Sequence, residues 1–96
     1  MYTLTNPSPR IILSHILTVH ESTKYTYIIL GKCGPTGKTW LYTQLRSRGF
    51  NVFEITEDVA SVGMTVEGSN SNQFIVNEQF KQITIILNRP LNEVLL

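Results

Sequence analysis

The residues in this chain best suited to chemistry are Gly37, Lys38 and Thr39, which stand between an apolar run and a run with helical spacing. A lysine supplies a full positive charge for an anion, and a threonine hydroxyl is a ligand that Mg²⁺ accepts. Two nearby glycines, Gly31 and Gly34, allow backbone N–H groups to turn inward around an anion, because a β-carbon would block that turn. These residue types predict that the segment binds a phosphate group.

The elements on either side of these glycines have the order that a phosphate-binding loop, or P-loop, requires. Residues 24–30 contain aromatic and β-branched residues and predict a buried strand. Residues 38–48 predict a helix, and Gly49 stands where a C-cap glycine belongs. A helix that begins at Lys38 presents its unpaired N–H donors and partial positive charge to the loop. As an exposed loop residue, Lys38 itself should add little to the stability of the fold.

The spacing departs from the usual P-loop pattern, G-x-x-x-x-G-K-[ST], at one position. The first glycine of that pattern would stand where this chain has Lys32, with Gly31 one residue earlier and Gly34 two residues later. An ordinary glycine-rich turn between a strand and a helix is therefore the alternative interpretation. The intact Gly-Lys-Thr after an apolar strand favours the P-loop.

Length and composition predict one small domain over residues 1–96, in which 42% of residues are hydrophobic and 16% are charged. The single cysteine, Cys33, excludes an intramolecular disulfide and suits a reducing, intracellular compartment. Eight basic and seven acidic residues give the chain a net charge of +1. The overall charge of the chain is therefore no reason to expect binding to a membrane or to nucleic acid. The apolar run at residues 11–19 is too short to cross a bilayer.

The remaining pattern predicts an α/β fold: a small P-loop-type domain with a mainly parallel sheet, flanked by helices in two or three layers, and one β-hairpin. Trp40 is expected in its core, and the last strand should end at Asn88. The expected elements are helices near 9–20 and 38–48, strands at 24–30, 50–55 and 82–87, and a hairpin formed by 64–67 and 74–76.

The segment ILGKCGPTGKTWLYTQL resembles the nucleotide-binding motif of superfamily-3 helicase domains in the replication-associated proteins of small circular single-stranded DNA viruses. Residues 64–95, a hairpin and a strand that ends in an asparagine near a proline, are similar to the late part of that domain. The resemblance covers about residues 25–95. It implies ATP and Mg²⁺ as cofactors, ATP hydrolysis as the activity, single-stranded DNA as a partner, and a place in the cytoplasm or nucleus of a host cell. It also implies assembly into a homo-oligomer or with a full-length homologue.

The resemblance also implies a role for each matched residue. Lys38 would contact the β- and γ-phosphates, and Thr39 would contact Mg²⁺. Asp58, with Glu57, would hold the metal or polarise the attacking water, and Asn88 would orient that water. The implied catalytic residues are therefore Lys38, Asp58 and Asn88; the nucleotide-binding residues are Gly34, Pro35, Thr36, Gly37, Lys38 and Thr39; and the metal ligands are Thr39 and Asp58.

The chain departs from that family in three respects. It contains no His-x-His or His-x-Gln endonuclease motif, and the expected hairpin turn at residues 67–70 has no basic residue, with Lys81 only later. Glu57-Asp58 also follows Thr39 earlier than the family's acidic strand does. Either a strand–helix unit has been deleted, or Glu57-Asp58 is a solvated loop start. In the second arrangement the strand at 50–55 lies at the sheet edge, with Asp58 far from the loop.

Two other functions remain open. The run GPTGKTWLYTQLRSRGFNV also resembles small nucleoside and nucleotide kinases, which would need a lid with arginines. A non-catalytic interaction or regulatory protein derived from a P-loop domain is the other alternative, favoured by the missing parts and by the apolar C-terminal residues.

Overall fold

The computed structural model of the chain describes residues 7–19, 24–31, 36–55 and 71–89. Apolar residues at three- and four-residue spacing form its helices, and runs rich in β-branched and aromatic residues form its strands. The elements are the helices α1 (Pro9–Val19) and α2 (Lys38–Ser47), and the strands β1 (Thr26–Gly31), β2 (Val52–Glu54), β3 (Gln73–Asn77) and β4 (Gln82–Leu87).

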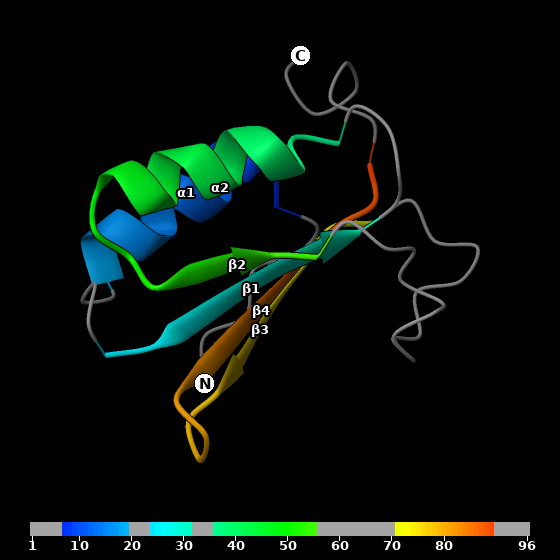
Figure 1. Cartoon of the computed structure of the whole chain (residues 1–96). Helices are drawn as coiled ribbons and strands as arrows, with labels where there is room; N and C mark the ends of the chain where they lie inside the picture. The colour runs from blue at the N-terminus through cyan, green and yellow to red at the C-terminus, as the bar shows by residue number, and fades with distance from the viewer. Residues whose placement is uncertain (1–6, 20–23, 32–35, 56–70, 90–96) are drawn as a thin grey trace.

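The four strands form one mixed sheet in the order β2-β1-β4-β3. Strand β1 pairs in parallel with both β2 and β4, whereas β3 and β4 are antiparallel neighbours. Because β1, β2 and β4 run in the same direction, their carboxyl ends meet at one edge of the sheet, beside the first turn of α2 (Figure 1). We call this the carboxyl edge; the last residues of its three strands are Gly31, Glu54 and Leu87.

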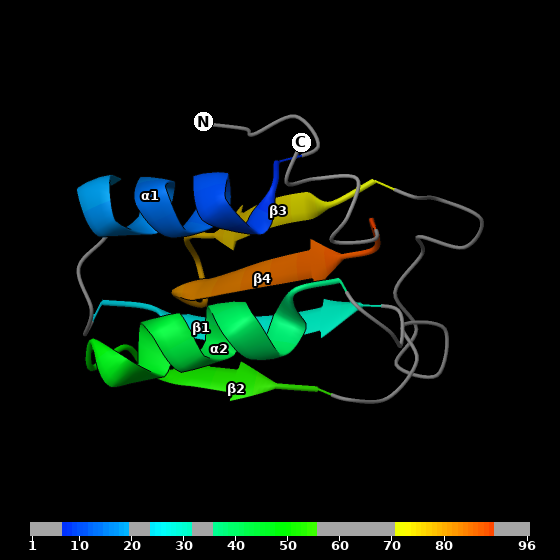
Figure 2. The same cartoon turned by 90° about the horizontal axis from the view of Figure 1, so that it is seen from above.

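Both helices lie on the same face of the sheet, with α2 over β1 and β2 and α1 on the side of β3 (Figures 1 and 2). Alternate strand residues point toward them, as the two-residue period of a strand requires. This face holds the main core, which consists of Ile12, Ile16, Tyr25, Tyr27, Ile29, Leu41, Leu45, Phe50, Val52, Phe74, Ile83, Ile85 and Leu87. Burial raises the pKa of Tyr27 to about 12, so this core phenol stays neutral.

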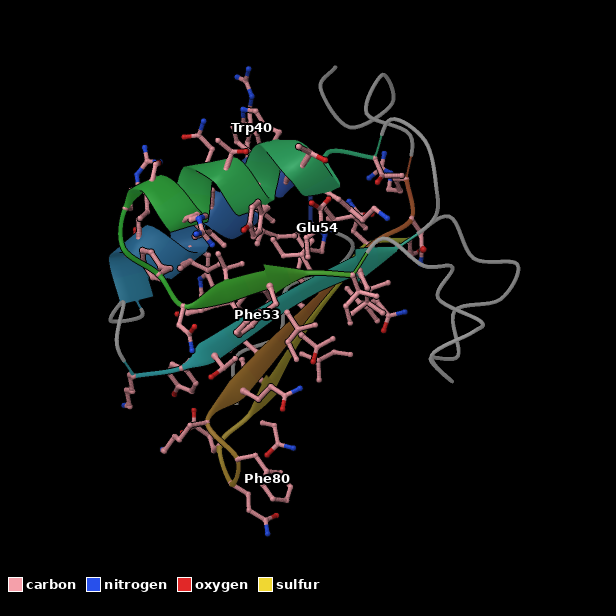
Figure 3. All side chains as sticks on the ribbon, viewed as in Figure 1. Trp40, Phe53, Glu54 and Phe80 are labelled. Carbon is pink, nitrogen blue, oxygen red and sulfur yellow. The ribbon has the colours of Figure 1, made fainter. Side chains whose placement is uncertain are left out.

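The other face of the sheet is covered by neither helix (Figure 1). Leu30 and Ile86 are buried there in a second, smaller apolar cluster. Phe53 and Ile75 lie on the same face but are 55% and 42% exposed, and Figure 3 shows Phe53 pointing away from the helices. The described part of the chain therefore consists of two layers, one of helices and one of sheet.

Local residues stabilise the helix ends, and the C-cap glycine lies where the sequence predicts it. The hydroxyl of Ser8 accepts a hydrogen bond from the N–H of Ile11 at 3.2 Å, as a helix N-cap does. Gly49 has φ 86°, in the left-handed region that glycine adopts without strain, and its N–H donates to the Arg46 carbonyl. The predicted helices and the strands at 24–30, 50–55 and 82–87 are confirmed, with shifts of a few residues at their ends.

One prediction stays open and one is corrected. Strand β3 pairs with β4 through a turn at residues 78–81, a pairing that the sequence did not predict; the expected pairing of β3 with residues 64–67 stays a prediction, because those residues lie outside the described part of the chain. Trp40, expected in the core, is 38% exposed, because Leu41 and Leu45 occupy the face of α2 that meets the sheet. In the part of the chain that the structure describes, the fold is α/β, with a mixed sheet of four strands and two helices.

Candidate functional site

The side chain of Lys38 lies against the end of β1 rather than in solvent. Lys38 is the first residue of α2, is only 8% exposed, and its Nζ donates to the carbonyl oxygen of Gly31 at 3.2 Å. The expectation that Lys38 is exposed is therefore wrong; that it adds little to the stability of the fold stays a prediction. A buried ammonium needs polar partners, and here a neutral backbone carbonyl is one of them. This contact fixes the lysine head at the carboxyl edge.

Gly31 stands at a close approach between β1 and the end of β4. A β-carbon at this position would lie 2.0 Å from the carbonyl oxygen of Leu87, its partner in the parallel register. Only glycine fits there without a shift of the backbone. As a result, the carbonyl that holds Lys38 is directly beside the peptide unit that leads into Asn88.

Thr39 and Glu54 form a second contact at the same edge. The Thr39 hydroxyl donates to Oε2 of Glu54 at 3.1 Å. Glu54 is the last residue of β2, the parallel neighbour of β1, and lies between β2 and α2 (Figure 3). Thr39 is exposed and Glu54 partly so. Mg²⁺ in nucleotide sites commonly takes one or two carboxylates with substrate phosphates and waters, and a hydroxyl and a carboxylate side by side suit it.

The first turn of α2 has donors to offer to a ligand. Its N-cap, Gly37, has φ 92° and ψ 10°, a left-handed conformation that favours glycine, and among the described residues no side chain caps the helix. Thr36, just before it, is 3% exposed, yet its hydroxyl has no hydrogen-bond partner in the described part of the chain. Uncapped N–H groups at a helix N-terminus, next to a buried lysine, are a favourable environment for an anion.

Asn88 follows β4 at the carboxyl edge and is 2% exposed. Its Nδ2 donates to the carbonyl of Ser71 at 3.1 Å. Its Oδ1 is buried and has no partner among the residues that the structure describes. Buried amide oxygens are nearly always hydrogen-bonded, so this oxygen is a candidate acceptor for a water or a ligand group.

The structure thus brings Lys38, Thr39 and Asn88 to one edge through three parallel strands and the start of α2. The predicted site residues Gly34, Pro35 and Asp58 lie outside the described residues and stay predictions. As one of the two predicted arrangements requires, β2 is an outer strand of the described sheet. It is also the direct neighbour of β1, so the carboxyl end of β2 lies at the start of α2.

Sequence reasoning missed two residues of this edge, Glu54 and Asn72. A signal for Glu54 is present in the sequence: it stands two residues after Val52, so the two share a strand face, and Val52 belongs to the core beneath α2. The acidic metal ligand was instead expected at Asp58, in the acidic pair at residues 57–58. Asn72 stands in a run of Ser, Asn and Gly that reads as a surface turn, and no local signal marks its burial.

In the described ranges, no group of three or more His, Cys, Asp or Glu side chains could hold a metal ion on its own. Any Mg²⁺ at Thr39 and Glu54 would therefore depend on ligands from a nucleotide and water. Among the helices that the structure describes, none has the length and apolar character needed to cross a membrane. No protein-family model matches this chain, and no curated protein or solved structure matches it either.

The close approach at Gly31 predicts a large difference between two glycine substitutions. Gly31→Ala should lower the free energy of unfolding by more than about 2 kcal/mol, because its methyl group would overlap backbone atoms of β4. Gly49→Ala is the matched control: its β-carbon would meet nothing within 4 Å, and only the positive φ opposes it, at about 1 kcal/mol. Urea unfolding of both variants measures this, and equal losses would contradict the close approach.

Proposed function

We propose that this chain binds ATP with Mg²⁺ at the amino end of α2, as a minimal or truncated NTPase similar to viral replication helicases. The observation that supports this best is the convergence at the carboxyl edge. The Lys38 ammonium donates a hydrogen bond to the Gly31 carbonyl, and the Thr39 hydroxyl donates one to the Glu54 carboxylate. In parallel α/β sheets, ligands bind beyond the carboxyl ends of the strands, which is where these side chains gather.

Phosphate binding would use contacts that already exist in part. Lys38 would exchange its bond to the neutral Gly31 carbonyl for a bond to an anionic phosphate oxygen, which is the stronger of the two because both partners are charged. The uncapped N–H groups of α2 and the Thr36 hydroxyl would donate to the same ligand. Gly34 and Pro35 remain part of the proposed binding segment on the strength of the motif.

For the metal, the geometry adds Glu54 to the ligands that the motif suggests. The bond between Thr39 and Glu54 holds a hydroxyl beside a carboxylate, a pair of oxygen ligands that Mg²⁺ beside a phosphate would accept. Asp58 stays a proposed metal or water ligand. The Oδ1 of Asn88, which has no partner among the described residues, would accept a hydrogen bond from an attacking water. Hydrolysis at such a site depends on positioning and charge neutralisation, with no covalent intermediate on the protein.

Single-stranded DNA is the proposed macromolecular partner, and the turn between β3 and β4 supports it. Phe80 in this turn is 69% exposed, and Lys81 follows it; Figure 3 shows Phe80 at the end of the sheet away from Glu54. An exposed ring next to a cation suits stacked bases and a phosphate backbone.

Lys81 also forms an ion pair with Glu78 at 3.1 Å. The pKa of Glu78 is lowered by its hydrogen bond from Tyr25 and then by Lys81.

A non-catalytic interaction protein is the second candidate. It is favoured by Phe53 and Ile75, two large apolar side chains exposed on the face of the sheet that the helices leave uncovered. Within the described residues, no feature favours the kinase alternative.

Calorimetric titration with ATP, with and without Mg²⁺, tests nucleotide binding. Lys38→Met keeps the aliphatic stem and should weaken ATP binding at least about ten-fold, the value of one charge-assisted hydrogen bond. Glu54→Gln should weaken binding with Mg²⁺ and leave binding in EDTA unchanged. Lys81→Met, a lysine at the opposite end of the sheet, is the control and should bind like the wild type. Equal ATP affinities for Lys38→Met and Lys81→Met would refute this site, and no binding by the wild type would favour the interaction protein.

Fluorescence anisotropy with labelled oligothymidine tests the DNA partner. Phe80→Ala should weaken binding about ten-fold, since stacking on one aromatic ring contributes roughly 1–3 kcal/mol per base. Phe53→Ala removes another exposed ring, one on the face of the sheet, and should have no effect. Similar losses in both variants, or an affinity that does not fall with added salt, would count against a nucleic-acid contact at this turn.

A further inference from the structure

We propose that Asn72 is a positioning residue of the nucleotide site: it fixes the chain at Asn88 and Arg89 so that the Asn88 amide faces the terminal phosphate. This inference rests on the proposed function and assigns discrimination between triphosphate and diphosphate to a residue that lies outside the P-loop motif.

The contacts of Asn72 join three segments that are far apart in the sequence. Asn72 is 1% exposed, and its Oδ1 accepts hydrogen bonds from the N–H groups of Asn88 at 2.8 Å and Arg89 at 3.0 Å. Its Nδ2 donates to the carbonyl of Pro7, just before α1, at 2.9 Å. One buried amide therefore ties the start of α1 and the approach to β3 to the end of β4.

This amide replaces the sheet ladder at the point where the ladder stops. The last pair between β3 and β4 joins Gln73 to Ile86, so the backbone of Asn88 lies beyond it. A buried N–H group without an acceptor costs free energy comparable to a lost hydrogen bond. The Asn72 oxygen serves two such groups at once, and this fixes the direction in which the chain leaves β4.

The side chain of Asn88 is held by the same segment as its backbone. Its Nδ2 donates to Ser71, the residue before Asn72, so its Oδ1 must face another way, and that oxygen has no partner among the described residues. The carbonyl of Leu87, one residue earlier, lies against Gly31, which holds the head of Lys38. Asn88 therefore holds a hydrogen-bond acceptor in a fixed orientation, one residue after Leu87, which lies against the glycine that binds Lys38.

Titration of ATP and of ADP, each with Mg²⁺, tests the role of Asn72. Asn72→Ala should lower the ratio of ATP affinity to ADP affinity about five-fold, the value of one hydrogen bond, and leave ADP affinity within about two-fold. Asn88→Ala should lower the ratio similarly, and the double variant should show no further loss, because both act through one contact. Asn77→Ala is the matched control: its amide also accepts a backbone N–H, that of Phe80, but at the other end of β3.

A merely structural role predicts a different result. Asn72→Ala would then weaken ATP and ADP binding by the same factor, or leave both unchanged while stability falls, and either result overturns the inference. If Asn72→Ala does not fold, Asn72→Leu, which fills nearly the same volume without an oxygen acceptor, is measured in the same way, and an unchanged ratio again overturns the inference. Failure of the wild type to bind either nucleotide would overturn the proposed function and this inference together.

Discussion

The hydrogen bond from Lys38 to the Gly31 carbonyl is the contact on which the candidate site depends. It joins the first residue of α2 to the last residue of β1, and so fixes where the N-terminus of the helix lies relative to the sheet. A buried ammonium is costly without polar partners, and this carbonyl is one that a phosphate can replace. The fold thus holds a cation in a fixed position, which would lower the cost of binding the proposed anion.

The parallel pairing of β1 with both neighbours gives that contact its surroundings. The register carries the ends of β2 and β4 to the same edge, and Glu54 and Asn88 come with them. Gly31 allows the backbones of β1 and β4 to approach closely, and Asn72 accepts hydrogen bonds from the backbone that follows β4. A cation, a hydroxyl with a carboxylate, and an amide oxygen without a partner among the described residues then lie at the carboxyl edge.

Patterns that are local in the sequence predicted much of this arrangement. The strand, the glycines and the helix around Lys38 follow from residue type and spacing alone, and so does the glycine at the end of α2. The partner of β3 did not follow, because strand propensity marks a strand without naming its neighbour. The burial of Lys38 also escaped prediction, since it results from the contact between two elements and a lysine in a loop is usually exposed.

The two missed polar residues differ in how far the sequence could have revealed them. The position of Glu54 could have been predicted, because the two-residue period of a strand places it on the same face as Val52. Asn72 was not, because its role arises where Pro7, Asn88 and Arg89 meet in three dimensions. Side chains that join distant segments leave no periodic signal in the chain.

A crystal structure of the chain with Mg²⁺ and a non-hydrolysable ATP analogue would test the central claim most directly. The account predicts that Nζ of Lys38 leaves the Gly31 carbonyl and lies about 2.8 Å from a phosphate oxygen, with the metal beside Thr39 and Glu54. An analogue bound elsewhere, or a Lys38 that keeps its bond to Gly31 in crystals grown at saturating analogue, would contradict it.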